Sequence, residues 1–286
     1  MEILSLKVHS TEGLTIQEVT FTDPTLLIGV SGSGKSQILS ALHGIFSLIR
    51  GEGGCTLGDG VYDVSFREGS SKYSYQAVIR DGGLAGSSYL QDGNPLSGHL
   101  NLRAAMPFVD FLGQVSQVRQ SGYLLEKTWL ATEKQQEEIK DLFRFIFPSV
   151  EAMVFFPEDI LVREAGLEGI SYKKLSDGML KALLYICELV TCQPGTVILI
   201  DEFENGLGLN CLSVLLEEML DRDDVQVIMS SHHPYVINNV PTAFWQVISR
   251  DRDQVGACSA SALGIGQTRY DAFFELMNIL SYGEEF

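Results

Sequence analysis

Three stretches of the chain are apolar at every position or nearly so. They are Thr25–Ile28, Val197–Ile200 and residues 225–229. A strand that helices cover on both faces has such a continuous apolar run, whereas a strand with one face in water alternates. We therefore expect these stretches to be buried strands of an α/β fold.

Alternating apolar and polar positions mark a second kind of strand. Residues 61–67 and 73–80 alternate around a polar turn at 68–71, which is the pattern of a β-hairpin. Residues 1–8 and 14–21 are also expected to be strands. The pattern predicts a mixed central sheet with an antiparallel β lobe.

Helical patterns follow the apolar strands. Residues 37–42 and 178–190 are expected to be helices, and residues 129–147 form the best helical stretch between them, ended by Pro148. Residues 154–163 are expected to be a strand. Residues 269–286 form an amphipathic helix with an acidic end, whose apolar side either packs in the core or docks a second subunit or partner. A sustained heptad repeat is absent from the sequence, which excludes long coiled-coil arms.

Composition places the chain among globular cytoplasmic proteins. Its 286 residues are 45% hydrophobic and 9% aromatic, enough for one large α/β domain or two small ones. The sequence has no apolar run of membrane-spanning length and no signal-peptide pattern. The five scattered cysteines lack the spacing of a metal site, so we expect reduced thiols in the cytoplasm.

The charge of the chain limits its partners. The formal net charge is −17, and the 20 lysines and arginines form no cluster beyond Lys173 and Lys174. Phosphate contacts from basic side chains dominate the affinity of proteins for duplex DNA. The composition therefore disfavours nucleic acid as the primary ligand.

Residues 29–36 have the sequence GVSGSGKS, which fits the phosphate-binding P-loop pattern between a strand and a helix. The glycines allow successive N–H groups to face phosphate oxygens, aided by the helix N-terminus. Lys35 is expected to contact the β- and γ-phosphates, and the Ser36 hydroxyl to bind Mg²⁺. The residues expected to contact the nucleotide here are Gly29, Ser31, Gly32, Ser33, Gly34, Lys35, Ser36 and Gln37.

Two further strand ends carry candidate catalytic residues. Asp201 and Glu202 follow Val197–Ile200, where α/β sheets place their ligands. Asp201 is expected to hold Mg²⁺ through water, and Glu202 to act as general base toward the attacking water. His232 follows the third apolar strand and is preferred over His233 as the residue that contacts the γ-phosphate.

The ordered set of motifs resembles the ABC-type ATPases. It consists of the P-loop, LSDG at 175–178, the strand ending in Asp-Glu, ENGLG at 204–208 and SSHH at 230–233. More narrowly, the set is similar to the AAA-labelled branch that includes the ATPase domains of the overcoming-lysogenization-defect nucleases and anti-phage ATPases. The resemblance implies a P-loop fold of ABC type for residues 1–250, with an insert at about 55–165, and a C-terminal extension at 251–286.

The resemblance also implies how two subunits cooperate. In such ATPases the signature of one subunit contacts the nucleotide held by the P-loop of the other. Ser176, Asp177 and Gly178 would therefore bind ATP in trans, in a homodimer or a larger assembly. The family also has a glutamine that meets Mg²⁺ and the attacking water. The candidates are Gln76, Gln91, Gln114 and Gln117, of which we select Gln91.

We expect an ATPase that regulates a separate effector, such as a nuclease or toxin, because the sequence has no second catalytic constellation. A role in anti-phage defence is implied by the resemblance alone. The alternatives are a DNA-repair clamp of the SMC type and, less favoured, a nucleotide-binding subunit of a membrane transporter. The first predicts coiled-coil arms or a basic groove, and the second predicts an LSGGQ signature.

Overall fold

The computed structural model describes residues 1–51, 55–96, 108–110, 121–266 and 269–282. The chain divides into two compact units. Unit 1 comprises Met1–Phe111, Pro194–Phe203 and Asp223–Phe286, and unit 2 comprises Leu112–Gln193 and Glu204–Arg222. None of the described helices is long and apolar enough to span a membrane.

Unit 1 is built on a sheet whose described part has 12 strands, in the order β7-β6-β5-β4-β1-β2-β15-β14-β3-β13-β12-β8. The strands β14, β3, β13, β12 and β8 run parallel to one another. The strand bounds are β1 Glu2–Ser10, β2 Thr15–Thr20, β3 Thr25–Ile28, β4 Gly60–Glu68, β5 Ser71–Arg80, β6 Gly83–Gln91, β7 Asn94–Pro95, β8 Phe108–Asp110, β12 Val197–Ile200, β13 Gln226–Ser230, β14 Trp245–Asp251 and β15 Gln254–Ser259.

The expected β-hairpin is present and continues the central sheet. β4 and β5 pair antiparallel, and β4 also pairs with β1, where Val64 faces Leu6. Alternate residues of β4 are buried because one face of this part packs in the core. The sheet also extends past residue 250, since β14 and β15 pair with each other across that position.

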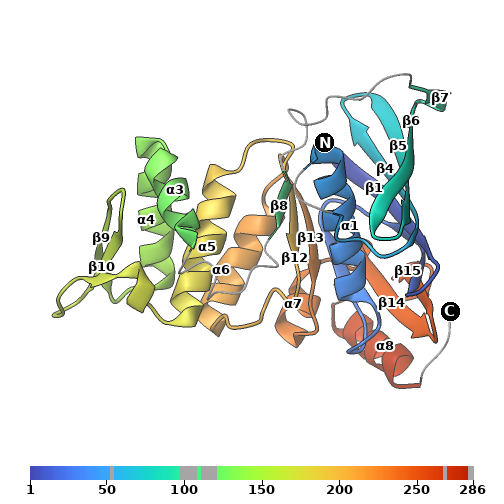
Figure 1. Cartoon of the computed structure of the whole chain (residues 1–286). Helices are drawn as coiled ribbons and strands as arrows, with labels where there is room; N and C mark the ends of the chain where they lie inside the picture. The colour runs from blue at the N-terminus through green and yellow to red at the C-terminus, as the bar shows by residue number, and fades with distance from the viewer. Residues whose placement is uncertain (52–54, 97–107, 111–120, 267–268, 283–286) are drawn as a thin grey trace. The chain divides into compact units, whose positions relative to one another are not determined.

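The helix α1 (Lys35–Arg50) covers the sheet of unit 1 (Figure 1). Its buried residues include Ile38, Leu42 and Phe46, which recur on one side at helical spacing. The ring of Phe46 meets that of Phe66 on β4 edge-on, with centroids 6.4 Å apart. The core thus holds the start of α1, and with it the P-loop, against the sheet. Two further helices of unit 1 are α7 (Pro234–Asn239) and α8 (Arg269–Tyr282), and η3 (Thr242–Phe244) is a short 3₁₀ turn.

Unit 2 contains four helices in its described part, α3 (Tyr123–Leu130), α4 (Glu133–Ile146), α5 (Asp177–Thr191) and α6 (Leu209–Leu220). It also has a small antiparallel sheet in the order β11-β10-β9, with bounds Ile170–Ser171, Ile160–Glu164 and Val150–Phe155, and a 3₁₀ turn, η2 (Tyr172–Lys174). α5 packs with α3, α4 and α6. Nine residues of α5 are buried, which identifies it as the central helix of the unit.

The structure corrects two expected elements of unit 2. Residues 129–147 are not one helix, because α3 ends at Leu130 and Thr132 starts α4 with a capping box to Gln135. Residues 154–163 are not one strand either. The N–H of Phe156 donates to the carbonyl of Asp159 in a turn that contains Pro157, so the segment forms the hairpin β9–β10.

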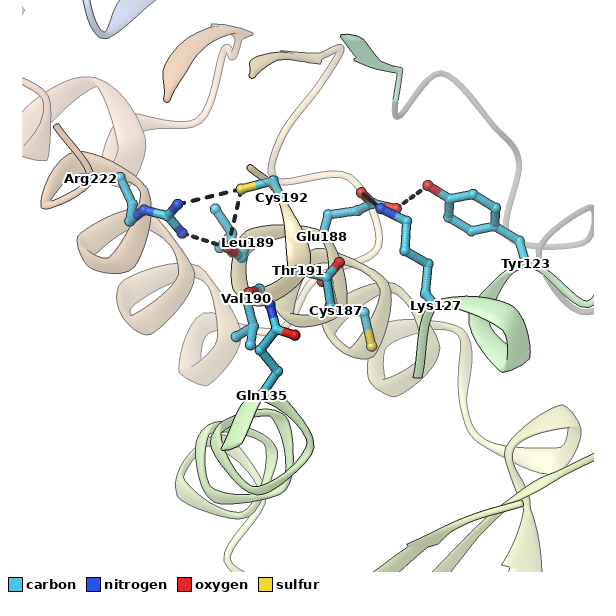
Figure 2. Close-up of polar contacts among 10 residues, drawn as sticks. All are labelled: Tyr123, Lys127, Gln135, Cys187, Glu188, Leu189, Val190, Thr191, Cys192 and Arg222. Atoms are coloured by element: carbon cyan, nitrogen blue, oxygen red, sulfur yellow. Dashed lines mark hydrogen bonds and ion pairs between the residues drawn. The ribbon is translucent and has the colours of Figure 1, made fainter. Parts of the chain in front are cut away.

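The carboxylate of Glu188 lies in the interior of unit 2, on α5. Its side chain has 0% exposure, and it accepts hydrogen bonds from the Tyr123 hydroxyl and, at 2.8 Å, from Lys127 Nζ (Figure 2). Both donors come from α3. Because a buried carboxylate is costly without partners, these bonds connect α3 firmly to α5.

Two other elements contact the last turn of α5. Gln135 of α4 donates to the carbonyl of Val190 at 3.1 Å, and Arg222, after α6, donates to the carbonyl of Leu189 at 2.5 Å (Figure 2). The last carbonyl groups of a helix have no partner within the helix. Neighbouring side chains therefore anchor the C-terminal end of α5, while its N-terminal end carries the LSDG segment.

Candidate functional site

The P-loop connects β3 to α1, as its pattern predicted, and two of its glycines have no room for a side chain. A Cβ on Gly29 would lie 2.4 Å from the carbonyl oxygen of Ile248. Gly34 has a φ of 111° and caps α1, and a Cβ there would lie 2.7 Å from Val255. Lys35, Ser36 and Gln37 form the first turn of α1, so their N–H groups are available to an anion.

Lys35 folds back over the loop that precedes it. Its Nζ donates to the carbonyl oxygens of Gly29 at 2.8 Å and Val30 at 3.0 Å, and lies 3.5 Å from Ser33 Oγ. Ser33 is buried, whereas Ser31, Gly32 and Ser36 are exposed. The ammonium group is thus held where phosphate oxygens would meet the N–H groups of the loop, and the residues fit a nucleotide phosphate chain.

The Ser230 hydroxyl organises the two acidic residues at the end of β12. Its Oγ donates to Asp201 Oδ1 at 2.5 Å and accepts the Glu202 N–H at 2.8 Å. The N–H of Phe203 donates to the carbonyl of Ser230 at 3.0 Å. The sequence alone gives Ser230 no role, although the residue belongs to the SSHH motif. Its position at the end of the adjacent parallel strand is the signal that points to this contact.

Strand register brings the P-loop, the acidic pair and the histidines to one edge of the sheet. Ile200 faces Met229 between β12 and β13, and Ser230 faces Leu27 between β13 and β3. The three strands are parallel, so Ile28, Ile200 and Ser230 end at the same edge.

The two adjacent histidines have different environments. His233 is the N-cap of α7, and its Nδ1 accepts the N–H of Tyr235 at 3.1 Å. His232 follows Ser231 at the strand end and is exposed. The cap occupies one ring nitrogen of His233, which favours His232 as the residue that reaches a ligand.

The signature residues lie in unit 2, at the start of α5. Ser176 is the N-cap, and its Oγ accepts the N–H of Met179 at 3.3 Å. Asp177 is exposed, and a Cβ on Gly178 would lie 2.9 Å from the carbonyl oxygen of Gly206. Lys181 donates to the carbonyl of Asn205. The LSDG and ENGLG segments therefore form one local structure within this unit.

The structure does not bring Gln91 to the nucleotide site, and this corrects the choice of Gln91 as a metal ligand. Gln91 ends β6, which six other strands separate from β3 in the sheet order, and its Nε2 donates to Ser71 Oγ at 3.2 Å. Gln76 lies on β5 and donates to Asp63 Oδ1 at 2.7 Å. Gln114 and Gln117 are outside the described residues.

Part of the chain matches a known protein family. The family model described as "AAA domain, putative AbiEii toxin, Type IV TA system" matches residues 121–238. No curated protein matches the chain.

Solved structures give matches over most of the chain. The SMC head domain from Thermotoga maritima is 17% identical with a TM-score of 0.59, over 91% of this chain and 99% of that one. An SMC head bound to the C-winged helix domain of ScpA is 13% identical with a TM-score of 0.62, over 90% of this chain and 98% of that one. The fold is therefore that of the SMC head. The predicted α/β fold of ABC-ATPase type and the resemblance to ABC/SMC-type ATPases of the AAA-labelled branch are confirmed.

Proposed function

From the ABC/SMC-type P-loop ATPase fold of this chain, we propose that the protein binds ATP with Mg²⁺, hydrolyses it, and dimerises around two ATP molecules. The observation that carries this proposal is the Ser230 bridge. One buried hydroxyl holds the Asp201 carboxylate and the Glu202 backbone at the sheet edge where the P-loop also begins. A P-loop with a positioned acidic pair is the arrangement that phosphoryl transfer to water requires.

Each residue of the site has a distinct role in this proposal. Lys35 exchanges its backbone carbonyl partners for β- and γ-phosphate oxygens. Ser36 would hold Mg²⁺ directly and Asp201 would hold it through water, and the ion would neutralise charge on the phosphates. Glu202 accepts the proton of the attacking water, and His232 donates a hydrogen bond to the γ-phosphate.

Dimerisation is proposed from the position of the signature. Ser176 and Asp177 are exposed at the N-terminus of α5, a helix end suited to a phosphate. In the ABC-type ATPases that the motifs resemble, this end meets the nucleotide of a second subunit. ATP then joins two copies of the chain, and hydrolysis releases them.

The biological role that we propose is regulation of a separate effector protein, a nuclease or toxin, in cytoplasmic anti-phage defence. The described residues contain no cluster of three or more metal-ligating side chains that would form a second catalytic centre. The matching family model names a putative toxin of a type IV toxin–antitoxin system. A regulatory ATPase beside a separate effector is consistent with both observations.

A second candidate function is a DNA clamp, which the SMC head fold favours. The net charge of −17 opposes it, because DNA affinity depends on basic side chains. DNA binding that falls steeply with salt concentration would support the clamp.

The Glu202→Gln variant tests the proposed ATPase. We expect hydrolysis to fall about 100-fold or more, since a general base contributes about that much. We also expect this variant to elute as a dimer with Mg-ATP in gel filtration with light scattering. Glu12→Gln, which removes a charge from an exposed loop, is the control and keeps the wild-type rate. Wild-type hydrolysis by Glu202→Gln would contradict the assignment of the base.

The same variant tests the proposed role. Glu202→Gln protein is recovered from its native cells in Mg-ATP, and its bound proteins and nucleic acids are identified. A stoichiometric partner with nuclease or toxin motifs would support the regulator. DNA alone, lost at higher salt, would favour the clamp, and a membrane protein would favour a transporter subunit.

A further inference from the structure

A groove in unit 2 lies along α4 beside α6, away from the residues assigned to nucleotide binding. It is open to solvent, has a volume of about 650 Å³, and has an apolar part, Leu142 and Phe145, and an acidic part, Glu137, Glu138, Asp141 and Glu218. Phe145 is 71% exposed, whereas Ile139, Phe143 and Ile146 on the other side of α4 are buried. Besides its buried side, α4 therefore presents the large apolar side chain of Phe145, which its own unit leaves mostly exposed.

The two helices that form the groove run in opposite directions. Asn210, at the start of α6, donates to the carbonyl of Ile146 at the end of α4, at 3.0 Å. Glu218, near the end of α6, is close enough to Glu138 to be affected by its charge. The groove follows α4 from Lys134 to Phe145, which is roughly 17 Å at 1.5 Å per residue, or about three helical turns.

Among the described residues, two of the four acidic side chains of the groove have a basic partner and two do not. Glu137 pairs with Lys140 at 2.7 Å, and Asp141 pairs with Arg144 at 2.5 Å. Glu138 and Glu218 form no ion pair with any described residue. Lys134, at one end, is the one basic residue among those that line the groove.

The negative charges near Glu218 affect the pKa of its carboxyl group. Desolvation raises the pKa of its carboxyl group above the ordinary value. The negative charges of Asp221, Glu138 and Glu217 raise it further, and Arg222 opposes them. A positive charge placed in the groove would relieve this repulsion.

We propose that the groove binds a cationic amphipathic helix, about three turns long, of a separate partner protein. Its apolar side chains would cover Phe145 and Leu142, and its lysines or arginines would pair with Glu138 and Glu218. Helix binding in a groove by an apolar face with charged flanks is a recurrent mode of recognition. A second copy of this chain is a poor occupant, because its lysines and arginines form no cluster in the sequence beyond Lys173 and Lys174.

The groove is the surface that we assign to the effector of the proposed function. What this partner does rests on that proposed function. Binding in the groove needs no nucleotide. The Lys35→Ala variant should therefore lose ATP binding and keep peptide binding, so the two proposals fail independently.

Selection from a random dodecapeptide library displayed on phage, with the full chain as bait, tests the groove. We expect enriched peptides with lysine or arginine and large apolar residues at helical spacing. A synthetic enriched peptide should bind about tenfold or more weakly to the double variant Glu138→Lys/Glu218→Lys, and also more weakly to Phe145→Ser. Glu168→Lys, an exposed charge reversal elsewhere in unit 2, is the matched control and should bind normally.

Several results would overturn the proposal. They are the absence of enrichment, enrichment of acidic peptides, and equal binding by the groove variants and the wild type. The proposal would also be overturned if the chain dimerised without nucleotide and Phe145→Ser abolished that dimer, because a second copy would then occupy the groove.

Discussion

At Glu202 the backbone has a φ of 48°, a left-handed conformation that is rare for residues other than glycine. The conformation is held by the hydrogen bond from its N–H to Ser230 Oγ at 2.8 Å. Strained backbone often occurs at functional sites, where the surrounding structure enforces it. The strain at Glu202 is consistent with a carboxylate that must point in one direction.

A pair of substitutions tests this strain. We expect Glu202→Gly to be about 1 kcal/mol more stable than Glu202→Ala, because glycine adopts a positive φ without steric cost. Both should lose ATP hydrolysis. Urea unfolding measures the difference. At Asp81, with a φ of 50°, glycine should again be favoured over alanine, with hydrolysis unchanged. An alanine variant of Glu202 as stable as the glycine variant would show that no strain is stored.

Asp23 connects stability to pH. Desolvation raises the pKa of its carboxyl group to about 6 from 3.8, against the hydrogen bond from the Val227 N–H and with the help of the Glu2 charge. The folded state then binds the proton more tightly than the unfolded state. Stability should therefore fall as the pH rises from about 4 to about 6 and stay lower above that range.

Asp23→Asn should remove this dependence. We expect the free energy of unfolding to rise by about 1 kcal/mol at pH 8 and to stay unchanged at pH 4. The gain at pH 8 is smaller than the full shift of the pKa implies, because the carboxyl group of Asp23 is still partly in contact with water. Thermal unfolding at both pH values measures the effect. Glu168→Gln, at an exposed site, should show none. An equal gain at both pH values would rule out the titration of Asp23 as the cause.

On the scale of single elements, the buried carboxylate of α5 has the largest expected effect. Lys127→Met removes the cation beside Glu188 and leaves the carboxylate inside unit 2 with the Tyr123 hydroxyl as a hydrogen-bond donor, at a cost of about 3 kcal/mol. Adding Glu188→Gln should recover most of this loss, because the amide is neutral and still accepts a hydrogen bond. The double-mutant cycle is read from urea unfolding.

The control for this prediction is an exposed pair in the same unit. Arg163 and Glu151 lie 3.5 Å apart with side chains 56% and 49% exposed. Arg163→Met should cost under about 1 kcal/mol. If Lys127→Met cost no more than Arg163→Met, the buried pair would not connect α3 to α5 as inferred.

Helices and strands were predicted well where a single local sequence pattern determines them. The helix after LSDG was expected at 178–190 and is α5, Asp177–Thr191. The long helix expected at 129–147 is instead divided, since Thr132 and Gln135 form reciprocal caps in the middle of an apolar pattern. Apolar periodicity continues across such a break, so the pattern alone does not reveal it.

For the whole molecule, the central prediction is that each nucleotide site needs two copies of the chain. Lys35→Ala disables the P-loop, and Ser176→Arg disables the signature. A mixture of equal amounts should recover roughly a quarter of the wild-type ATPase rate, because half of the dimers are mixed and each has one intact site. Each variant alone should be inactive in a phosphate-release assay.

Mixing Lys35→Ala with Glu202→Gln is the control. Both substitutions lie on the same side of the proposed site, so no intact site can form and no activity should return. Absence of recovery in the first mixture, with both proteins folded, would contradict the site shared between two subunits.

The sequence by itself determined the parts whose chemistry is local. The P-loop at 29–36, the acidic pair after Val197–Ile200 and the histidines after the third apolar strand each lie at a strand end that apolar runs reveal. Parallel pairing then brings the three ends to one edge.

Only the tertiary structure decided the contacts between residues far apart in the chain. It placed Gln91 on β6 at a distant part of the sheet, joined Ser230 to Asp201, and set α6 beside α4 to form the acidic groove. A local pattern reports which face of an element is buried. It does not report which distant element covers that face, because this depends on strand order, register and helix packing over the whole fold.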